Sequence, residues 1–133
     1  MPVYSHSRLS TFESCPLKYK LNYKDNIKRD EQGIEAFMGS RFHETMEKLY
    51  KELDYKIYTP EELINYYSAR WDKEYNGNVV IVNKDRSAED YKNIGRKCIE
   101  SYYKRYHPFN QGRVLGLERQ IMIKLDEEGR YML

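Results

Sequence analysis

An apolar stripe at helical spacing in residues 34–53 constrains the fold of this chain more than any other feature. Large apolar side chains recur there at steps of three and four residues, the spacing of one buried face of an α-helix. The stripe consists of Ile34, Phe37, Met38, Phe42, Met46, Leu49, Tyr50 and Leu53. It predicts one long amphipathic helix that packs this face against the rest of the domain.

Within this predicted helix, Gly39 lies one turn before His43. Helical side chains lean toward the N-terminus, so the imidazole of His43 is expected to project over a residue that has no side chain. Glycine in a helix interior costs up to about 1 kcal/mol relative to alanine, which suggests that Gly39 serves a purpose. Two alternatives are open. Gly39 clears space for His43 and its ligand, or it lets another backbone pack closely while His43 is an ordinary boundary residue.

Capping signals predict further helices on both sides of this one. Ser7 is expected to cap a short helix that ends near Cys15, and Pro16 is expected to open another helical turn. Residues 59–62, Thr-Pro-Glu-Glu, combine an N-cap, a proline at the first helical position and a glutamate three residues after the cap. Residues 87–90 form a similar capping box before another apolar stripe. Most of the chain is therefore predicted to be helical.

The periodicity changes to two in residues 114–125, where apolar residues alternate along the chain. This pattern predicts a strand, followed by a turn at residues 126–129 and a returning strand at residues 130–133. Residues 79–82 are either a short strand or a buried loop. The predicted fold class is α/β, with N-terminal helices packing on an incomplete mixed sheet of which only the first hairpin is present. A lone hairpin is marginally stable, so we expect the front part of a longer protein, with a dimer through the exposed sheet edge as a further alternative.

The charge is nearly balanced, with 23 basic and 21 acidic residues and a net charge of +2. That total does not argue for nucleic acid. Residues 18–29, however, hold five basic residues and one acid, and the chain has 14 tyrosines that could stack on bases. A solvated lysine face is the alternative explanation. No apolar run reaches the roughly 20 residues of a membrane span, and no secretory leader is visible, so a cytoplasmic protein without membrane contact is expected.

The two cysteines, Cys15 and Cys98, lack the close spacing of zinc ligands, and sequence alone does not pair them. Cys98 falls on the apolar side of a predicted helix, so we expect it to be a small core residue.

Three segments in order resemble motifs of one family. The opening YSHSRLSTFESCPLKYKLNY at residues 4–23 is similar to the start of RecB-type nuclease domains of the PD-(D/E)XK superfamily, which includes AddB-type and CRISPR-associated members. The segment GSRFHETMEKLY at residues 39–50 resembles the family's Gly-x-x-x-His helix. The late segment LGLERQIMIKLDEEGRYML at residues 115–133 resembles its first sheet strand and the turn that follows. The resemblance covers residues 1–133 as the N-terminal portion of one restriction-endonuclease-like domain.

The resemblance implies metal-dependent hydrolysis of DNA with Mg²⁺ or Mn²⁺, in repair, recombination or defence. His43 and Glu118 would be the catalytic and metal-binding residues, and DNA would be the partner. A helicase or other repair or defence subunits are further expected partners. Arg8, Lys18, Lys20 and Arg41 are the expected nucleic-acid-binding residues. Glu47 could also reach the metal, although an ion pair with Lys51 is the interpretation that we favour.

The chain departs from the family pattern in one respect that bears on activity. The family's Gly-x-x-Asp step and acid-x-Lys triplet on the next two strands have no counterpart at comparable places in residues 1–133. We therefore expect this chain to be inactive by itself. A non-catalytic nucleic-acid-binding or protein-interaction module is the alternative, and a nuclease-like scaffold inside a larger repair complex is a third.

Cys15 has a second implication by resemblance. Some members of the family hold a four-iron cluster with an N-terminal cysteine at this Cys-Pro step and three cysteines near the C-terminus. Cys15 would then be a cluster ligand in a complete protein. The alternative is that Cys15 is a buried structural residue.

Overall fold

A computed structural model describes residues 3–127 of the chain. The described residues fall into two compact units, one comprising residues 3–29 with 119–127 and the other Asp30–Glu118. In chain order the elements are α1 (His6–Ser14), α2 (Pro16–Tyr19), η1 (Lys20–Lys24), β1 (Gln32–Gly33), α3 (Ile34–Lys51), α4 (Pro60–Glu74), β2 (Val79–Val80) and α5 (Ala88–Tyr106). The described chain is thus mostly helical, as the sequence predicted.

The helices of the second unit begin where their capping residues predict. Thr59 and Glu62 form a reciprocal capping box at the start of α4, and Ser87 and Asp90 form another at the start of α5. Each box satisfies backbone N–H groups that a helix start otherwise leaves without partners. The long helix α3 begins directly after Gly33, as predicted.

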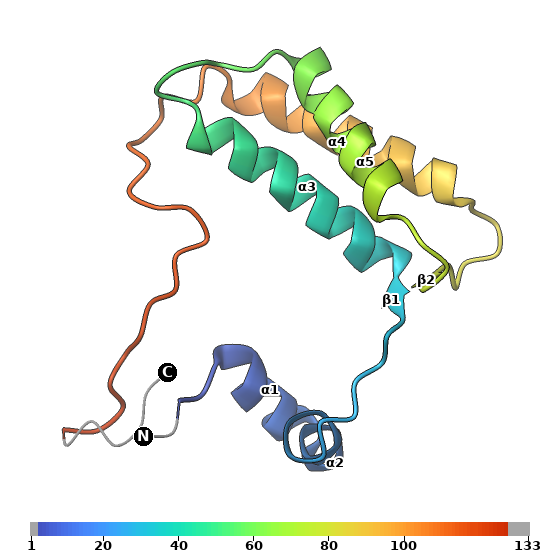
Figure 1. Ribbon diagram of the computed structural model, residues 1–133. Coiled ribbons are helices and arrows are strands. Elements are labelled where there is room, and N and C mark those ends of the chain that lie inside the picture. The colour runs from blue at the N-terminus through green and yellow to red at the C-terminus, as the bar shows by residue number, and fades with distance from the viewer. Residues whose placement is uncertain (1–2, 128–133) are drawn as a thin grey trace. The chain divides into compact units, whose positions relative to one another are not determined.

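The core of the second unit lies between α3, α4 and α5, which lie side by side in Figure 1. Every residue of the predicted stripe on α3 is either buried in this core or packed against it. The ring of Trp71 on α4 meets the ring of Phe37 on α3 edge to face at 4.9 Å. The buried apolar residues are Ile34, Phe37, Leu49, Leu63, Tyr67, Trp71, Tyr91, Ile99 and Phe109.

Gly95 allows α4 and α5 to approach closely. A Cβ atom placed on Gly95 would lie 2.5 Å from Cζ of Tyr67, which is too close for non-bonded atoms. The side chain of Tyr67 is fully buried, and its hydroxyl has no hydrogen-bond partner among the described residues. Burial raises the pKa of Tyr67, because the charged phenolate would lose its hydration.

The sheet of the described residues is a single short pair. Strand β1 pairs with β2 in parallel, with Gln32 opposite Val79 and Gly33 opposite Val80. Residues 79–82 were predicted as a strand or a buried loop, and only the first two of them are strand. This pair ties the start of α3 to the connection between α4 and α5.

The predicted hairpin is not formed in the described residues, so this part of the α/β prediction is wrong. Residues 114–125 are irregular apart from a single bridge residue, Lys124. Glu118 has a φ of 46°, a left-handed conformation that interrupts an extended strand. A strand also needs a neighbour for its backbone hydrogen bonds, and the described part of this segment forms no ladder. The predicted returning strand, residues 130–133, lies outside the described residues.

The first unit begins with a helical hairpin. Ser5, rather than the predicted Ser7, caps α1, with its Oγ accepting a hydrogen bond from the Arg8 backbone N–H at 3.2 Å. Helix α1 ends at Ser14 before Pro16 opens α2, as predicted. The π-helix η1 then continues α2, and the Asp25 N–H donates to the Lys20 carbonyl five residues earlier.

Both cysteines are exposed and free. The prediction that Cys98 is a core residue is therefore wrong, because the buried face of α5 carries Tyr91, Gly95 and Ile99 instead. The alternative of a buried Cys15 is wrong as well.

None of the described helices combines the length and apolarity that a membrane crossing requires.

Candidate cation site

His43 and Glu118 lie together in the second unit. His43 is on the solvent-facing side of α3, and its Nδ1 lies 3.4 Å from Oε1 of Glu118. Their side chains are 74% and 68% exposed, respectively. Because both side chains are exposed, the pair is accessible to a ligand, and a contact between exposed side chains adds little to the stability of the fold.

The backbone of Glu118 is held in an unusual conformation. Its φ of 46° lies in the left-handed region, which costs a non-glycine residue on the order of 1 kcal/mol or more. Residues in such conformations cluster at functional sites. Here the conformation belongs to the residue whose carboxylate faces His43.

The pair lines a small open pocket of about 110 Å³. Glu47, one turn after His43 on α3, also lines it, together with Met46, Tyr50, Leu117 and the pair itself. The ion pair that we favoured between Glu47 and Lys51 is not present among the described residues. Glu47 is therefore a second carboxylate beside His43.

The surroundings of Gly39 contradict one of its two proposed roles, the close packing of another backbone, whereas clearing space for a ligand of His43 stays a prediction. A Cβ atom placed on Gly39 would meet no heavy atom of the described chain within 4 Å, outside its neighbours and its own helix backbone. It would touch neither a packed backbone nor the imidazole of His43. The close helix approach imagined for Gly39 is found at Gly95 instead.

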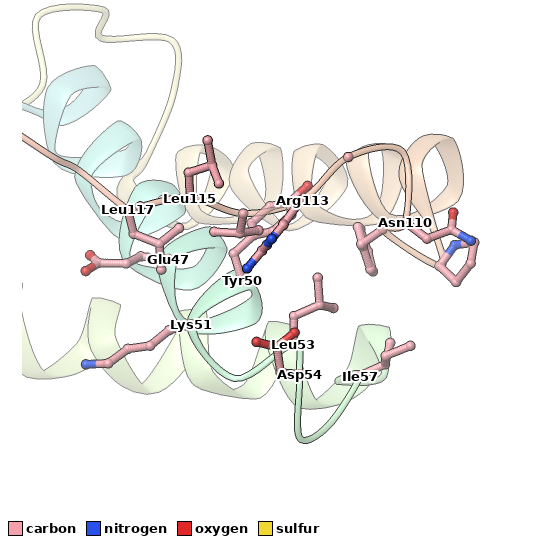
Figure 2. Close-up of a pocket in the computed structure, with 15 residues that line it drawn as sticks. Glu47, Tyr50, Lys51, Leu53, Asp54, Ile57, Asn110, Arg113, Leu115 and Leu117 are labelled. Atoms are coloured by element: carbon pink, nitrogen blue, oxygen red, sulfur yellow. The ribbon is translucent and has the colours of Figure 1, made fainter.

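A larger pocket of about 860 Å³ adjoins the small one and shares Glu47, Tyr50 and Leu117 with it. It lies between the C-terminal half of α3, the connection to α4 and residues 108–117. Figure 2 shows Glu47 and Leu117 at one end of this pocket and Asn110 at the other. Its charged lining is mixed, with Lys51 and Arg113 beside Glu47 and Asp54.

The expected nucleic-acid-binding residues differ in their environments. Arg41 is 12% exposed, its Nη2 lies 2.9 Å from Oε1 of Glu44, and its guanidinium lies over the Phe37 ring. In the first unit, the guanidinium of Arg8 packs against tyrosine rings, whereas Lys18 and Lys20 are exposed. Only the two lysines are fully available to a phosphate, and the binding role of all four stays a prediction.

Two acid-x-Lys triplets escaped the sequence reasoning, at residues 54–56 and 90–92. Three of their four charged residues, Lys56, Asp90 and Lys92, are engaged in structural contacts, whereas Asp54 lines the larger pocket. Lys56 pairs with Glu62 at 3.0 Å. Asp90 forms the capping box of α5, and Lys92 pairs with Asp72 at 2.9 Å. Neither triplet lines the small pocket of His43 and Glu118.

Comparison with known families identifies the family to which the chain belongs. The model of the PD-(D/E)XK nuclease superfamily matches residues 3–130, which is nearly the whole sequence. The chain belongs to the PD-(D/E)XK nuclease superfamily. No curated protein and no solved structure matches it at a significant level. The described helices and the two-residue strands do not by themselves make up a complete restriction-endonuclease fold.

Members of this superfamily typically use divalent metal ions, and the pair in the second unit suits a hard cation in part. Two ligands in neighbouring positions of an octahedral Mg²⁺ site, each about 2.1 Å from the ion, lie about 3 Å apart. The 3.4 Å between His43 and Glu118 is close to that spacing. No group of three His, Cys, Asp or Glu residues that could hold a metal occurs among the described residues. The pair would therefore be part of a site that water and phosphate oxygens complete.

An iron–sulfur cluster does not fit the residues in hand. A four-iron cluster uses four thiolates, and the sequence has two cysteines. They belong to different units, Cys15 to the first and Cys98 to the second.

Proposed function

We propose that the protein is a RecB-like, metal-dependent DNA nuclease. In this proposal His43 and Glu118 form part of its cation site. The observation that carries the proposal is the 3.4 Å approach of the two side chains, from elements 75 residues apart in a chain of this superfamily. An exposed pair is not needed for folding. A binding role accounts for an imidazole and a strained carboxylate residue meeting in one pocket.

Each residue has a defined part in this proposal. The Glu118 carboxylate and a neutral His43 nitrogen are the donors that would hold Mg²⁺ or Mn²⁺, and Glu47, which lines the same pocket, would hydrogen-bond to a coordinated water. A divalent ion in such a site polarises the scissile phosphate and offsets the charge that develops during hydrolysis. The acid-x-Lys function is not supplied by residues 1–133, so we expect this segment alone to bind the ion without cutting DNA.

Because residues 1–133 alone are not expected to cut DNA, the proposal is tested with the complete nuclease that contains them, by Mn²⁺-dependent hydrolysis of end-labelled single- and double-stranded DNA. His43→Ala and Glu118→Gln should each lower the rate by about 10²–10³-fold, the loss typical of removing one electrostatic group from an active site. His107→Ala and Glu100→Gln are matched controls on α5 and its C-cap, and neither residue lines the pocket. Unchanged hydrolysis in both site variants would refute the proposed roles.

A second candidate is a nucleic-acid-binding module without catalysis. It is favoured by the engagement of Asp90 in helix capping and of Lys56 and Lys92 in ion pairs, which occupies the lysine of each acid-x-Lys triplet. Under this alternative the protein binds DNA, but no divalent ion produces cleavage, and the His43 and Glu118 variants bind as the wild type does.

A further inference from the structure

The helical hairpin of the first unit has an open pocket of its own. It has a volume of about 520 Å³, within the range of small-molecule sites. Its lining comes from α1, α2 and η1 and from Tyr4, two residues before α1, and consists of Tyr4, Leu9, Phe12, Pro16, Tyr19, Lys20 and Lys24. All of these residues belong to a single unit, so the pocket is defined within that unit.

Two lysines, Lys20 and Lys24, contribute ammonium groups to this lining. Lys20 and Lys24 are the first and last residues of η1 and lie about one turn apart. Both are exposed, and neither has an ion-pair partner among the described residues. No acidic residue lines the pocket. The charge of the pocket is therefore suited to an anionic ligand.

The lining also contains three aromatic rings, those of Tyr4, Phe12 and Tyr19. Phe12 meets Tyr19 edge to face at 5.3 Å, and the Phe12 side chain is 53% exposed. A large apolar ring left half in water is free to pack against a flat ligand. The combination of ring faces with paired lysines is the one that single-stranded nucleic acids use, through base stacking and phosphate contacts.

Arg8 fixes the tyrosines of this pocket. Its guanidinium lies within 5.5 Å of the ring centres of Tyr4, Tyr19 and Tyr23, and its Nε–H donates to the Tyr19 hydroxyl at 3.0 Å. Such contacts hold the rings in place before any ligand arrives. Arg8, which we expected to touch nucleic acid directly, is in this arrangement a positioning residue.

We propose that this pocket binds one nucleotide of a single DNA strand, with the base against Phe12 and Tyr19 and the adjacent phosphates at Lys20 and Lys24. A base inside a duplex has both faces covered by its neighbours, so only an unstacked base can use these rings. The inference rests on the proposed function for its choice of DNA. It concerns a different unit from His43 and Glu118, and it requires no metal ion.

The test is fluorescence anisotropy of a labelled oligothymidylate with the 133-residue chain, in EDTA, over a series of salt concentrations. EDTA removes divalent ions, so the result does not depend on the cation site. Phe12→Leu keeps an apolar side chain but removes the ring face. It should weaken binding by about 5-fold or more, since stacking of one base contributes about 1–3 kcal/mol, and it should leave the salt dependence unchanged.

The lysines have a different signature. The double variant K20Q/K24Q should reduce the slope of log K against log salt by about 1.4, which corresponds to two contacts with single-strand phosphates. The matched control K28Q/R29Q removes the same charge from exposed residues of the same unit that do not line the pocket. It should change the slope by less than half as much.

Several results would overturn the proposal that this pocket binds a nucleotide. They are equal binding by the wild type and Phe12→Leu, equal slope changes in the two double variants, or no binding of single strands by the wild type at low salt. The first two leave the nuclease proposal standing, because that proposal is tested by metal-dependent hydrolysis in the His43 and Glu118 variants. Conversely, unchanged hydrolysis in the His43 and Glu118 variants would refute the nuclease proposal and leave the pocket standing, because the anisotropy series requires no metal ion and no cleavage.

Discussion

The two units differ in how they use their apolar side chains. The second unit buries a cluster of large apolar residues between α3, α4 and α5. In the first unit, no described residue is buried, whether in 3–29 or in 119–127. Large apolar side chains there are exposed, namely Val3, Leu9, Phe12, Leu17, Leu21, Ile27, Ile121, Met122, Ile123 and Leu125. One unit is organised around a core, and the other around ring contacts with a single arginine.

This difference teaches where stability and binding are expected to reside. Removing a buried side chain loses both its transfer free energy and its packing contacts. Removing a half-exposed ring loses little of either. Substitutions in the second unit should therefore change folding, whereas substitutions in the hairpin of the first unit should change ligand binding.

The largest difference in stability between the two units is expected for Trp71→Ala compared with Phe12→Ala. Trp71 is 4% exposed between Phe37 and Tyr67, whereas Phe12 is 53% exposed. Trp71→Ala should lower the free energy of unfolding by about 3–5 kcal/mol, and Phe12→Ala by less than about 1 kcal/mol. Urea unfolding followed by circular dichroism measures both. Similar losses in the two variants would break the comparison.

Two glycines of the second unit give a comparison of opposite sign. Gly95→Ala places a methyl group against the buried Tyr67 ring, and such overpacking should cost about 1–3 kcal/mol. Gly39→Ala meets no heavy atom within 4 Å in the described structure, and it should stabilise α3 by up to about 1 kcal/mol.

Thermal unfolding of the two single variants provides the measurement. Adding Tyr67→Phe to Gly95→Ala should restore part of the lost stability, because it removes the hydroxyl that the new methyl group meets. If Gly95→Ala were as stable as the wild type, the close approach of α4 and α5 would not be as described.

The smallest effect concerns Glu44, which joins α3 to α4. Burial raises the pKa of this carboxyl, but the hydrogen bond from Arg70 and the charges of Arg41 and Arg70 outweigh burial and hold the pKa below its usual value of 4.5. A lowered pKa in the folded state means that the ionised carboxylate stabilises the fold above pH 4.5, and that this contribution is lost as the pH falls through the folded-state value.

Glu44→Gln should therefore reduce stability by up to about 1 kcal/mol at pH 7 and make little difference at pH 3. Urea unfolding at both pH values measures this change, with Glu100→Gln as the control because Glu100 is an exposed residue of α5 without an ion pair in the described structure. A loss that is the same at both pH values would exclude the charge as its cause.

The helices could be predicted from sequence because their signals are local. Capping boxes and three- and four-residue spacing act within a few turns, and they located α3, α4 and α5 correctly. The strand at residues 114–125 could not be settled in this way, since alternation describes what a strand needs and not whether a partner is present. Gly39 and Gly95 are alike in sequence context, and only the packing of Tyr67 distinguishes them.

The candidate site was only partly accessible from sequence. Periodicity alone gave no reason to join His43 with Glu118, because one is on a helix and the other in a distant irregular segment. The order of the family motifs supplied that connection. The pocket of the first unit was missed, although Phe12, Tyr19 and the two lysines at residues 20 and 24 carried a signal. Their spacing on two short helices that end in a π-helical turn places these four side chains in the lining of one pocket.

The most direct test of the central claim, a cation site at His43 and Glu118, uses the three histidines of the chain. Substoichiometric Mn²⁺ broadens the imidazole NMR signals of residues that lie near the ion, and His6 and His107 serve as internal controls. Selective broadening of the His43 signal in the wild type, lost in Glu118→Gln, is the result that the account predicts. Broadening of His43 no greater than that of His6 and His107, or unchanged by Glu118→Gln, would contradict it.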